Sequence, residues 1–331
     1  MLYNFKYPLL YSNFDFFKFI YLKTFNSIAT YHSKRKSIVT IGTFDGVHLG
    51  HKKILEKIIY NSELYDCESV VLTFFPHPRM VLEEDSDIKL LNTVDEKVKL
   101  FGNLGLDNLI IHPFNEEFSK LSAEEFVKSI LVDKLNIKKI IIGYDHRFGK
   151  NRLANIDDLI IYGEKYGFEV EQITAQELND IAISSTKIRN SILEGNIELA
   201  NNYLGYNYFF SGTVVKGNQL GRTINYPTAN INVEEKYKLI PKNGVYIVSS
   251  NFKNKIIYGM MNIGNRPTVD GKNTTIEVNF FNLNENLYHE YLTISILKKV
   301  RDEIKFNSTH ELQNQLNKDK KNSLLYLSDF K

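Results

Sequence analysis

The apolar pattern of the chain changes character near residue 205, and this change limits the possible folds more than any other feature. Before it, short β-branched runs alternate with segments of helical periodicity. Such alternation is typical of a parallel sheet with helices on both faces. After it, short β-rich runs follow one another with Gly, Asn and Pro between them, which predicts a small antiparallel barrel. Residues 308–326 predict a closing C-terminal helix.

The first half can be divided into expected strands and helices. The expected strands are 37–44, 69–75, 108–114, 138–144 and 168–173, and the expected helices are 48–60, 94–104, 122–135 and 157–166. Ser122 followed by Glu125 predicts a capping box at the start of its helix. Residues 185–204 predict one further helix that bridges two domains. Ligands of parallel sheets bind at the carboxyl ends of the strands, so we expect the site there.

Composition bounds the kind of protein this chain can form. The chain has 331 residues, enough for two domains, and 41 Lys and Arg against 39 Asp and Glu give a formal net charge of +2. So small a charge creates no strong field for nucleic acid or a membrane surface, and we expect neither as a partner. The single cysteine, Cys67, predicts a small buried side chain in a reducing compartment, the cytoplasm.

The N-terminal 26 residues have no clear place in this pattern. They are rich in aromatic residues, are interrupted by charged residues, and lack the features of a signal peptide. No apolar run in the chain reaches the roughly 20 residues that a membrane span needs. We interpret residues 1–26 as a poorly ordered extension, with an aromatic docking segment as the alternative.

The segment GTFDGVHLGHKK (42–53) is the strongest local signal in the first half. It follows a strand and opens a helix, so its glycines let backbone approach a ligand and its free N–H groups can bind phosphate. His48 and His51 lie three residues apart and share one helical face, where imidazoles can donate hydrogen bonds to a phosphoryl group. The alternatives are a capped helix with two surface histidines, or a metal pair, for which no third ligand has obvious spacing.

In the second half, the segment 212–231 combines a glycine-containing loop with the sequence PTAN. Gly217 and Gly221 give the loop flexibility beside a strand. Thr228 and Asn230 stand two residues apart in an extended segment, so their side chains project to the same side. Hydroxyl and amide oxygens are hard ligands suited to Mg²⁺ held with ATP phosphates. For PTAN alone, a strand start with polar residues facing water is the simpler interpretation.

In combination, the motifs of the first half resemble the adenylyltransferase half of prokaryotic bifunctional riboflavin kinase/FMN adenylyltransferases (FAD synthetases). GxFDGxHxGH is followed in order by TFFPHPRMVL (73–82), GYDHRFGKNR (143–152) and ISSTKIR (183–189). The resemblance implies a Rossmann-like nucleotidyltransferase domain with His48 and His51 as catalytic residues. The residues that it implies for ATP binding are Gly42, Thr43, Phe44, Asp45, Gly46, His48, His51, Ser184, Ser185, Thr186 and Arg189. Those that it implies for flavin binding are His77, Asp145, Arg147 and Phe148.

Simpler interpretations remain for parts of this series. In GYDHRFG, His146 stands where an aromatic Phe is usual, and a structural turn explains the segment nearly as well. His77 lies between two prolines, so a rigid turn explains it equally well. Hydroxyls at a helix start and the guanidinium of Arg189 suit ATP phosphates, although ISSTKIR alone would be interpreted as an N-cap with a surface arginine.

The second half resembles the riboflavin kinase domain of the same family, over nearly all of 208–331. The resemblance rests on KGNQLGRTINYPTANI, NGVYIV (243–248), NIGNRPTV (262–269), TIEVNFF (275–281) and RDEIKF (301–306). It implies that Thr228 and Asn230 bind Mg²⁺ with ATP. It also implies that Glu277 is the catalytic base that activates the ribityl 5′-hydroxyl of the flavin. The further residues that it implies for ATP or flavin are Gly217, Gly221 and Arg301.

Three positions of the second half depart from the family pattern. Asn225 replaces a glycine and Tyr226 a phenylalanine before PTAN. Asn tolerates left-handed backbone better than most residues, so we expect the turn to survive. Tyr206 stands where the sequence LGR is usual, and we expect this change to weaken an interdomain or phosphate contact without touching a proposed catalytic atom.

The resemblance implies a bifunctional transferase. It would phosphorylate riboflavin to FMN with ATP, then adenylylate FMN to FAD with a second ATP and release pyrophosphate, with Mg²⁺ accompanying ATP. We expect residues 27–187 to form the adenylyltransferase domain, 188–206 a helical linker and 207–331 the kinase domain, in a monomer or weak homo-oligomer. The alternatives are a single retained activity, an adenylyltransferase for a pantetheine or nicotinamide phosphate, and a non-enzymatic flavin-binding regulator.

Overall fold

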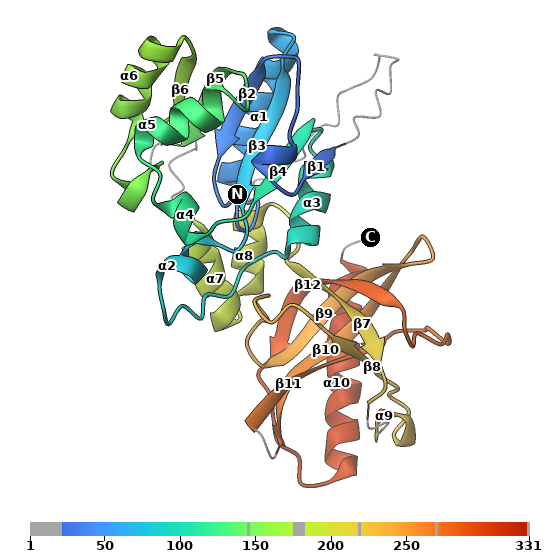
Figure 1. The fold of residues 1–331 in the computed structure, drawn as a ribbon. Helices are drawn as coiled ribbons and strands as arrows, with labels where there is room; N and C mark the ends of the chain where they lie inside the picture. Colours follow the sequence, from blue (N-terminus) through green and yellow to red (C-terminus); the bar gives the residue numbers. More distant parts are fainter. Residues whose placement is uncertain (1–21, 144–145, 175–182, 218–219, 269–270, 330–331) are drawn as a thin grey trace, which may run out of the picture.

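The computed structural model describes residues 22–143, 146–174, 183–217, 220–268 and 271–329. These residues form two units, a parallel sheet flanked by helices and a closed barrel with a long helix against it (Figure 1). This arrangement confirms the fold class that the pattern predicts. Within the described ranges, no helix combines the length and apolarity that crossing a membrane requires.

The sheet of the first unit has six parallel strands in the order β1-β4-β3-β2-β5-β6. The strands are β1 (Lys23–Phe25), β2 (Ser37–Ile41), β3 (Glu68–Phe74), β4 (Asn108–His112), β5 (Ile137–Gly143) and β6 (Glu169–Ile173). The chain runs from β2 to β3 on one side, whereas β5 and β6 lie on the other side of β2. The carboxyl end of β2 is therefore at the topological switch point, where ligands bind in such sheets.

Helices cover both faces of this sheet. They are α1 (Leu49–Leu64), α2 (Pro78–Leu82), α3 (Val94–Gly102), α4 (Glu116–Ser119), α5 (Ala123–Phe126) and α6 (Ile156–Tyr166), with 3-10 turns at Ile28–Thr30 and Lys150–Arg152. Neighbouring strand residues enter opposite cores, as the period of two requires: Ile38 packs with α1 on one face, and Val39 packs on the other. The buried strands are apolar on both faces for this reason.

Residues 23–25 correct the expected N-terminal extension. They form β1, which pairs in parallel with β4 at the edge of the sheet, so the ordered domain begins before residue 27. Phe25 is half-buried and packs edge-to-face on the ring of Tyr31, 5.2 Å between centroids, which explains why this short segment joins the sheet. Residues 1–21 of the proposed extension lie outside the described residues.

Two expected helices are interrupted. The capping box of Ser122 and Glu125 is present, but the following helix continues as a π-helical segment, Val127–Val132. The single helix expected over 185–204 is two helices, α7 (Ser185–Glu194) and α8 (Ile197–Leu204). Gly195 ends α7 with a left-handed backbone, φ +84°, which a residue with a side chain rarely adopts.

The second unit is a closed antiparallel barrel with the strand order β10-β11-β8-β7-β12-β9. Its elements are β7 (Phe209–Val215), α9 (Leu220–Thr223), β8 (Ala229–Asn232), β9 (Gly244–Phe252), β10 (Lys255–Thr268), β11 (Gly271–Phe280), β12 (Tyr291–Arg301) and α10 (Thr309–Ser328). The buried side chains of α7 and α8 belong to the same apolar cluster as the barrel core, and the two helices lie at the junction of the two units (Figure 1).

Candidate active sites

The GTFDG loop connects β2 to α1 at the switch point of the sheet. β2 ends at Ile41, and α1 begins after His48, which caps the helix. Gly46 lies in the loop with φ +89°, and a Cβ there would come within 2.6 Å of the Leu91 side chain. Only glycine fits this backbone and this space, so the loop can pack directly against Leu91. The first N–H groups of α1 follow at the end of the loop.

His48 and His51 form a stacked pair at the start of α1. Their ring centroids are 3.6 Å apart and the planes are inclined by 17°. The backbone N–H of His51 donates to Nδ1 of His48 at 3.3 Å, and the ring of Phe44 packs edge-on against His51 at 5.0 Å. The spacing of three residues therefore places the two rings on one face, as the sequence predicts. The ring of Phe44, from the loop, packs against His51 of this pair.

Both imidazoles are neutral at pH 7. Burial lowers the pKa of His48 to about 4. Burial, followed by the nearby His48 and the charge of Lys97, lowers the pKa of His51 well below its ordinary value. Because Nδ1 of neutral His48 accepts a hydrogen bond, its proton is on Nε2, which can donate to a ligand. A neutral donor pair at a helix N-terminus suits the binding of phosphate oxygens.

These pKa shifts predict that the first unit loses stability as pH falls from 6.5 towards 4. In this window an unfolded chain binds protons on His48 and His77, whereas the folded chain, with both pKa values near 4, does not. Protons then favour unfolding. Thermal unfolding across this pH range checks the prediction. The double variant His48→Asn/His77→Asn keeps both helix caps without the titration, so its unfolding midpoint should depend less on pH. A pH dependence of the unfolding midpoint equal to that of the parent chain would contradict the prediction.

Asp45 connects the loop to the ISSTKIR segment. Its carboxylate accepts from Arg189 Nη2 at 2.8 Å and from the backbone N–H of Leu91 at 2.9 Å. Ser185 Oγ donates to the Asp45 carbonyl at 2.8 Å. Ser184 caps α7 through the backbone N–H of Lys187. The start of α7 is thus held against the GTFDG loop, although the two segments lie 140 residues apart.

The remaining residues expected in the first unit are arranged in different ways. His77 caps α2, and its pKa falls to about 4 through burial, with Asp45, Lys97 and Arg189 as neighbouring charges, so it faces the same cluster. Thr186 and Arg147 are exposed. Phe148 is 6% exposed and packs near Phe126 in the core, and its role in flavin binding stays a prediction. Asp145 lies outside the described residues.

Tyr206 also differs from its expectation. Its hydroxyl donates to the carbonyl of Gly46 at 2.7 Å, and Lys52 lies over its ring at 5.2 Å from the centroid. It therefore contacts the GTFDG loop directly and adds an interdomain bond there. Sequence reasoning missed this contact because nothing local to Tyr206 indicates a partner 160 residues earlier.

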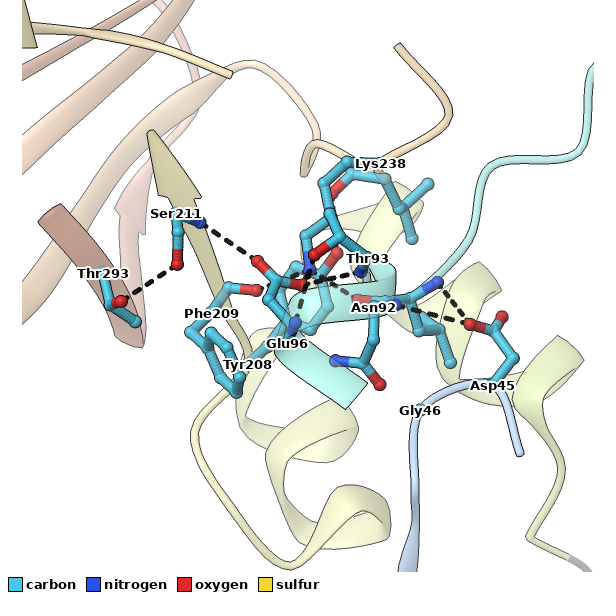
Figure 2. Close-up of polar contacts among 12 residues, drawn as sticks. Asp45, Gly46, Asn92, Thr93, Glu96, Tyr208, Phe209, Ser211, Lys238 and Thr293 are labelled. Atoms are coloured by element: carbon cyan, nitrogen blue, oxygen red, sulfur yellow. Dashed lines mark hydrogen bonds and ion pairs between the residues drawn. The ribbon is translucent and has the colours of Figure 1, made fainter. Parts of the chain in front are cut away.

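A buried ion pair joins the two units beside this loop. Lys238, in the connection between β8 and β9, reaches Glu96 of α3 at 2.6 Å, and both side chains are almost fully buried. Its ammonium donates to three acceptors: Glu96, the carbonyl of Leu91 at 2.6 Å and that of Phe209 at 2.7 Å. Figure 2 shows Lys238 beside Glu96 and Phe209. The other oxygen of Glu96 accepts from the backbone N–H of Ser211 in β7 at 3.1 Å. All three donors of Lys238 are satisfied.

Lys238→Met should destabilise the chain by about 3–5 kcal/mol, because it leaves Glu96 buried without its counter-charge. Equilibrium unfolding in urea measures the loss. Lys242→Met is the matched control, since Lys242 pairs with Asp302 at 3.3 Å at the surface, where such pairs contribute at most about 1 kcal/mol. Equal losses in the two variants would contradict a stabilising role for the buried pair.

In the second unit, the register of β8 and β11 brings the proposed magnesium ligands to the proposed base. Asn230 lies directly opposite Glu277, and the hydroxyl of Thr228 donates to Glu277 Oε2 at 3.2 Å. Directly opposite residues share a face of a sheet, as do residues two apart. The neighbours of Glu277 in β11, Ile276 and Val278, enter the barrel core, so this cluster lies on the outer face, where all three side chains are half-buried.

A glycine allows the neighbouring loop to approach this outer face. A Cβ on Gly217 would lie 2.3 Å from Nδ2 of Asn230, so the backbone there packs directly on the Asn230 amide. A Cβ on Gly221 would likewise lie 2.1 Å from the carbonyl oxygen of Tyr226. Asn225 has φ +61°, so the turn survives the loss of the usual glycine, as expected.

Arg301 has a structural partner. Its Nε and Nη2 donate to Asp319 of α10, the shorter bond at 2.8 Å, and Asp319 is 1% exposed. The guanidinium thereby fixes the C-terminal helix to the end of β12. This contact accounts for Arg301 without a ligand, and its role in binding ATP or flavin stays a prediction.

Two separate polar clusters, one at a helix tip beside a parallel sheet and one on a barrel, define a two-domain transferase that acts on nucleotides. Residues 30–187 match the family model described as FAD synthetase, and residues 204–327 match that described as riboflavin kinase. The chain belongs to the family of bifunctional riboflavin kinase/FMN adenylyltransferases. It phosphorylates riboflavin to FMN and adenylylates FMN to FAD, the two steps that the motifs predict.

Individual relatives agree along most of the chain. The bifunctional riboflavin kinase/FMN adenylyltransferase of Buchnera aphidicola subsp. Schizaphis graminum is 43% identical over 287 residues, covering 86% of this chain and 91% of its own. The protein of that name from Bacillus subtilis is 36% identical, covering 89% and 94%. The crystal structure of a macrolide-efflux protein from Streptococcus pneumoniae has a TM-score of 0.83 at 30% identity, covering 91% of this chain and 97% of that one.

Proposed function

We propose that the two polar clusters divide the two reactions: the stacked histidines of the first unit serve FMN adenylylation, and the Glu277 cluster of the barrel serves riboflavin phosphorylation. The observation that carries this proposal is the separation of the clusters on different units, each with the donors or oxygens that its own step needs. The proposed boundaries are 27–187, with β1 added before them, 188–206 and 207–331. The order of the steps makes FMN the product of one unit and the substrate of the other.

Adenylyl transfer at the first unit needs no protein nucleophile. A phosphate oxygen of FMN attacks the α-phosphorus of ATP, the bond to the bridging oxygen of the β-phosphate breaks, and pyrophosphate leaves. The chain orients the two anions and stabilises the negative charge that develops. We assign this role to the N–H groups of His48 and His51 and to the N-terminus of α1. Arg189 and the hydroxyls of α7 would close over the ATP phosphates, and His77 and Arg147 remain proposed flavin contacts.

Phosphoryl transfer at the barrel requires a base. The carboxylate of Glu277 takes the proton from the 5′-hydroxyl of riboflavin while that oxygen attacks the γ-phosphorus of ATP, and ADP leaves as the β–γ bridging bond breaks. The Thr228 hydroxyl donates to Glu277, which orients the carboxylate for this task. Gly217 lets the loop backbone approach the cluster closely.

The residues around Glu277 fit a magnesium ion held together with ATP. Thr228 and Asn230 offer hard oxygens on one face, and a carboxylate lies beside them. Within the described ranges, no group of three or more His, Cys, Asp and Glu side chains provides an all-protein metal centre. When bound, the ion would offset phosphate charge; Thr228 and Asn230 would hold it.

One incubation tests this proposal. The full chain with riboflavin, ATP and MgCl₂ should produce FMN first and FAD later, as separated flavins on a chromatogram. With FMN supplied in place of riboflavin, FAD should form directly. EDTA should stop FMN formation and added Mg²⁺ should restore it. FMN formation that persists in excess EDTA would contradict the magnesium assignment. We place the protein in the cytoplasm, because both reactions consume ATP and the sole cysteine, Cys67, is a buried thiol.

A further inference from the structure

Lys97 of α3 is a buried cation that none of the motifs marks. It is 8% exposed, and its ammonium donates to the carbonyl of Thr43 in the GTFDG loop at 2.7 Å. Across the residues that the structure describes, this is its one hydrogen bond, and it makes no ion pair. Lys238, another buried lysine at 2% exposure, has three acceptors including a carboxylate. The difference matters because a buried charge without a counter-charge is costly.

The nearest carboxylate does not supply this counter-charge. Asp45 raises the pKa of Lys97 through space, which shows that the two groups are neighbours, whereas burial lowers it. The carboxylate of Asp45 is already bonded to Arg189 and to the N–H of Leu91. The one negative charge is therefore matched by one guanidinium, and the charge of Lys97 remains in excess.

The surroundings of Lys97 are those of an anion site. Its charge lowers the pKa values of both His51 and His77, so it lies among the histidines at the tip of α1. Nδ1 of His51 is buried and has no hydrogen-bond partner among the described residues. Together with the free N–H groups of α1, these groups can be satisfied at once by an anion with several oxygens.

We propose that Lys97 is a catalytic residue of adenylyl transfer, whose ammonium binds a phosphate group of the reacting pair, ATP or FMN. The proposal rests on the adenylyl transfer assigned to this loop above, which FAD formation by the parent chain tests separately. As the α-phosphorus bond breaks, negative charge grows on the departing pyrophosphate, and a buried ammonium stabilises it more than a solvated one does.

Lys97→Met removes the charge and keeps the length of the side chain, and Lys97→Arg restores a cation. Lys99→Met is the matched control, because Lys99 lies on the exposed side of the same helix. With FMN and ATP supplied, we expect Lys97→Met to lower kcat/KM for FAD formation by about 10²-fold or more. The kcat/KM of Lys97→Arg should be about tenfold higher than that of Lys97→Met. Lys99→Met should match the parent chain, and FMN formation from riboflavin should be unchanged in all three.

Inhibition by inorganic pyrophosphate separates a charge role from a structural one. A contact with the ATP phosphates predicts that Lys97→Met weakens pyrophosphate inhibition and raises KM for ATP by about tenfold, whereas a contact with the FMN phosphate raises KM for FMN instead. If Lys97→Arg is as impaired as Lys97→Met and both keep parental pyrophosphate inhibition and KM values, Lys97 acts only by holding the Thr43 carbonyl. That result overturns the proposal, as does parental kcat/KM in Lys97→Met.

Discussion

His51→Ala is expected to lower the rate of FAD formation from FMN by about 10²–10³-fold, the usual loss when one oriented donor to a developing charge is removed. The change removes one ring of the stacked pair, so His48 also loses its partner at 3.6 Å. Because His51 is neutral at pH 7, the loss should persist across neutral pH. Chromatography of the flavins formed from FMN and ATP measures it.

The second activity of the same chain is the internal control for this variant. FMN formation from riboflavin should stay within about twofold of the parent rate, because the Glu277 cluster lies on the other unit and shares no residue with the histidines. His51→Gln keeps an amide donor near the position of Nε2 and should lose less than His51→Ala. An equal fall of both activities in His51→Ala would indicate damage to the whole fold and would count against the division of labour.

Glu277→Gln is expected to lower FMN formation and to spare FAD formation, the reverse of the result expected for His51→Ala. Replacing the carboxylate by an amide keeps the size of the side chain and an oxygen that can accept from Thr228, but removes the base. FMN formation should fall by about 10²–10⁴-fold, the range for loss of a general base. FAD formation should be nearly unchanged when FMN is supplied, which the same chromatographic assay measures.

A surface carboxylate provides the matched control for Glu277→Gln. Glu285 lies beyond the end of β11, is exposed, and forms an ion pair with Lys253. Glu285→Gln removes the same charge from the same unit and should leave both activities at the parent level. Retained FMN formation in Glu277→Gln would show that another group takes the proton from riboflavin.

Much of the fold and of both clusters could be predicted because the signals are local. The spacing of His48 and His51 determines their stacking, since residues three apart on a helix share a face. Thr228 and Asn230 share a side because strand residues alternate. Even the break at Gly195 had a local signal, a glycine between two helical stretches, which a single-helix interpretation of 185–204 overlooked.

Other features depend on partners far apart in the sequence. Phe148 and Arg301 stand in family-like motifs, yet one packs in a core and the other pairs with a residue of α10. Nothing in the local pattern distinguishes a side chain that meets a ligand from one that meets another part of the chain. The position of Glu277 on the outer face of the barrel likewise follows from its register with β8.

The sequence by itself determined the two units, the histidine pair at the tip of α1 and the order of the barrel segments, because backbone periodicity and capping act over a few residues. Only the tertiary structure decided that Lys238 of the barrel is buried against Glu96, 142 residues earlier. It alone also decided that Lys97, which follows Glu96 in α3, lies beside the GTFDG loop without a counter-charge. Both lysines are buried, so the carboxylate that only Lys238 meets creates the difference, because a charge in low-dielectric surroundings is costly unless it is paired.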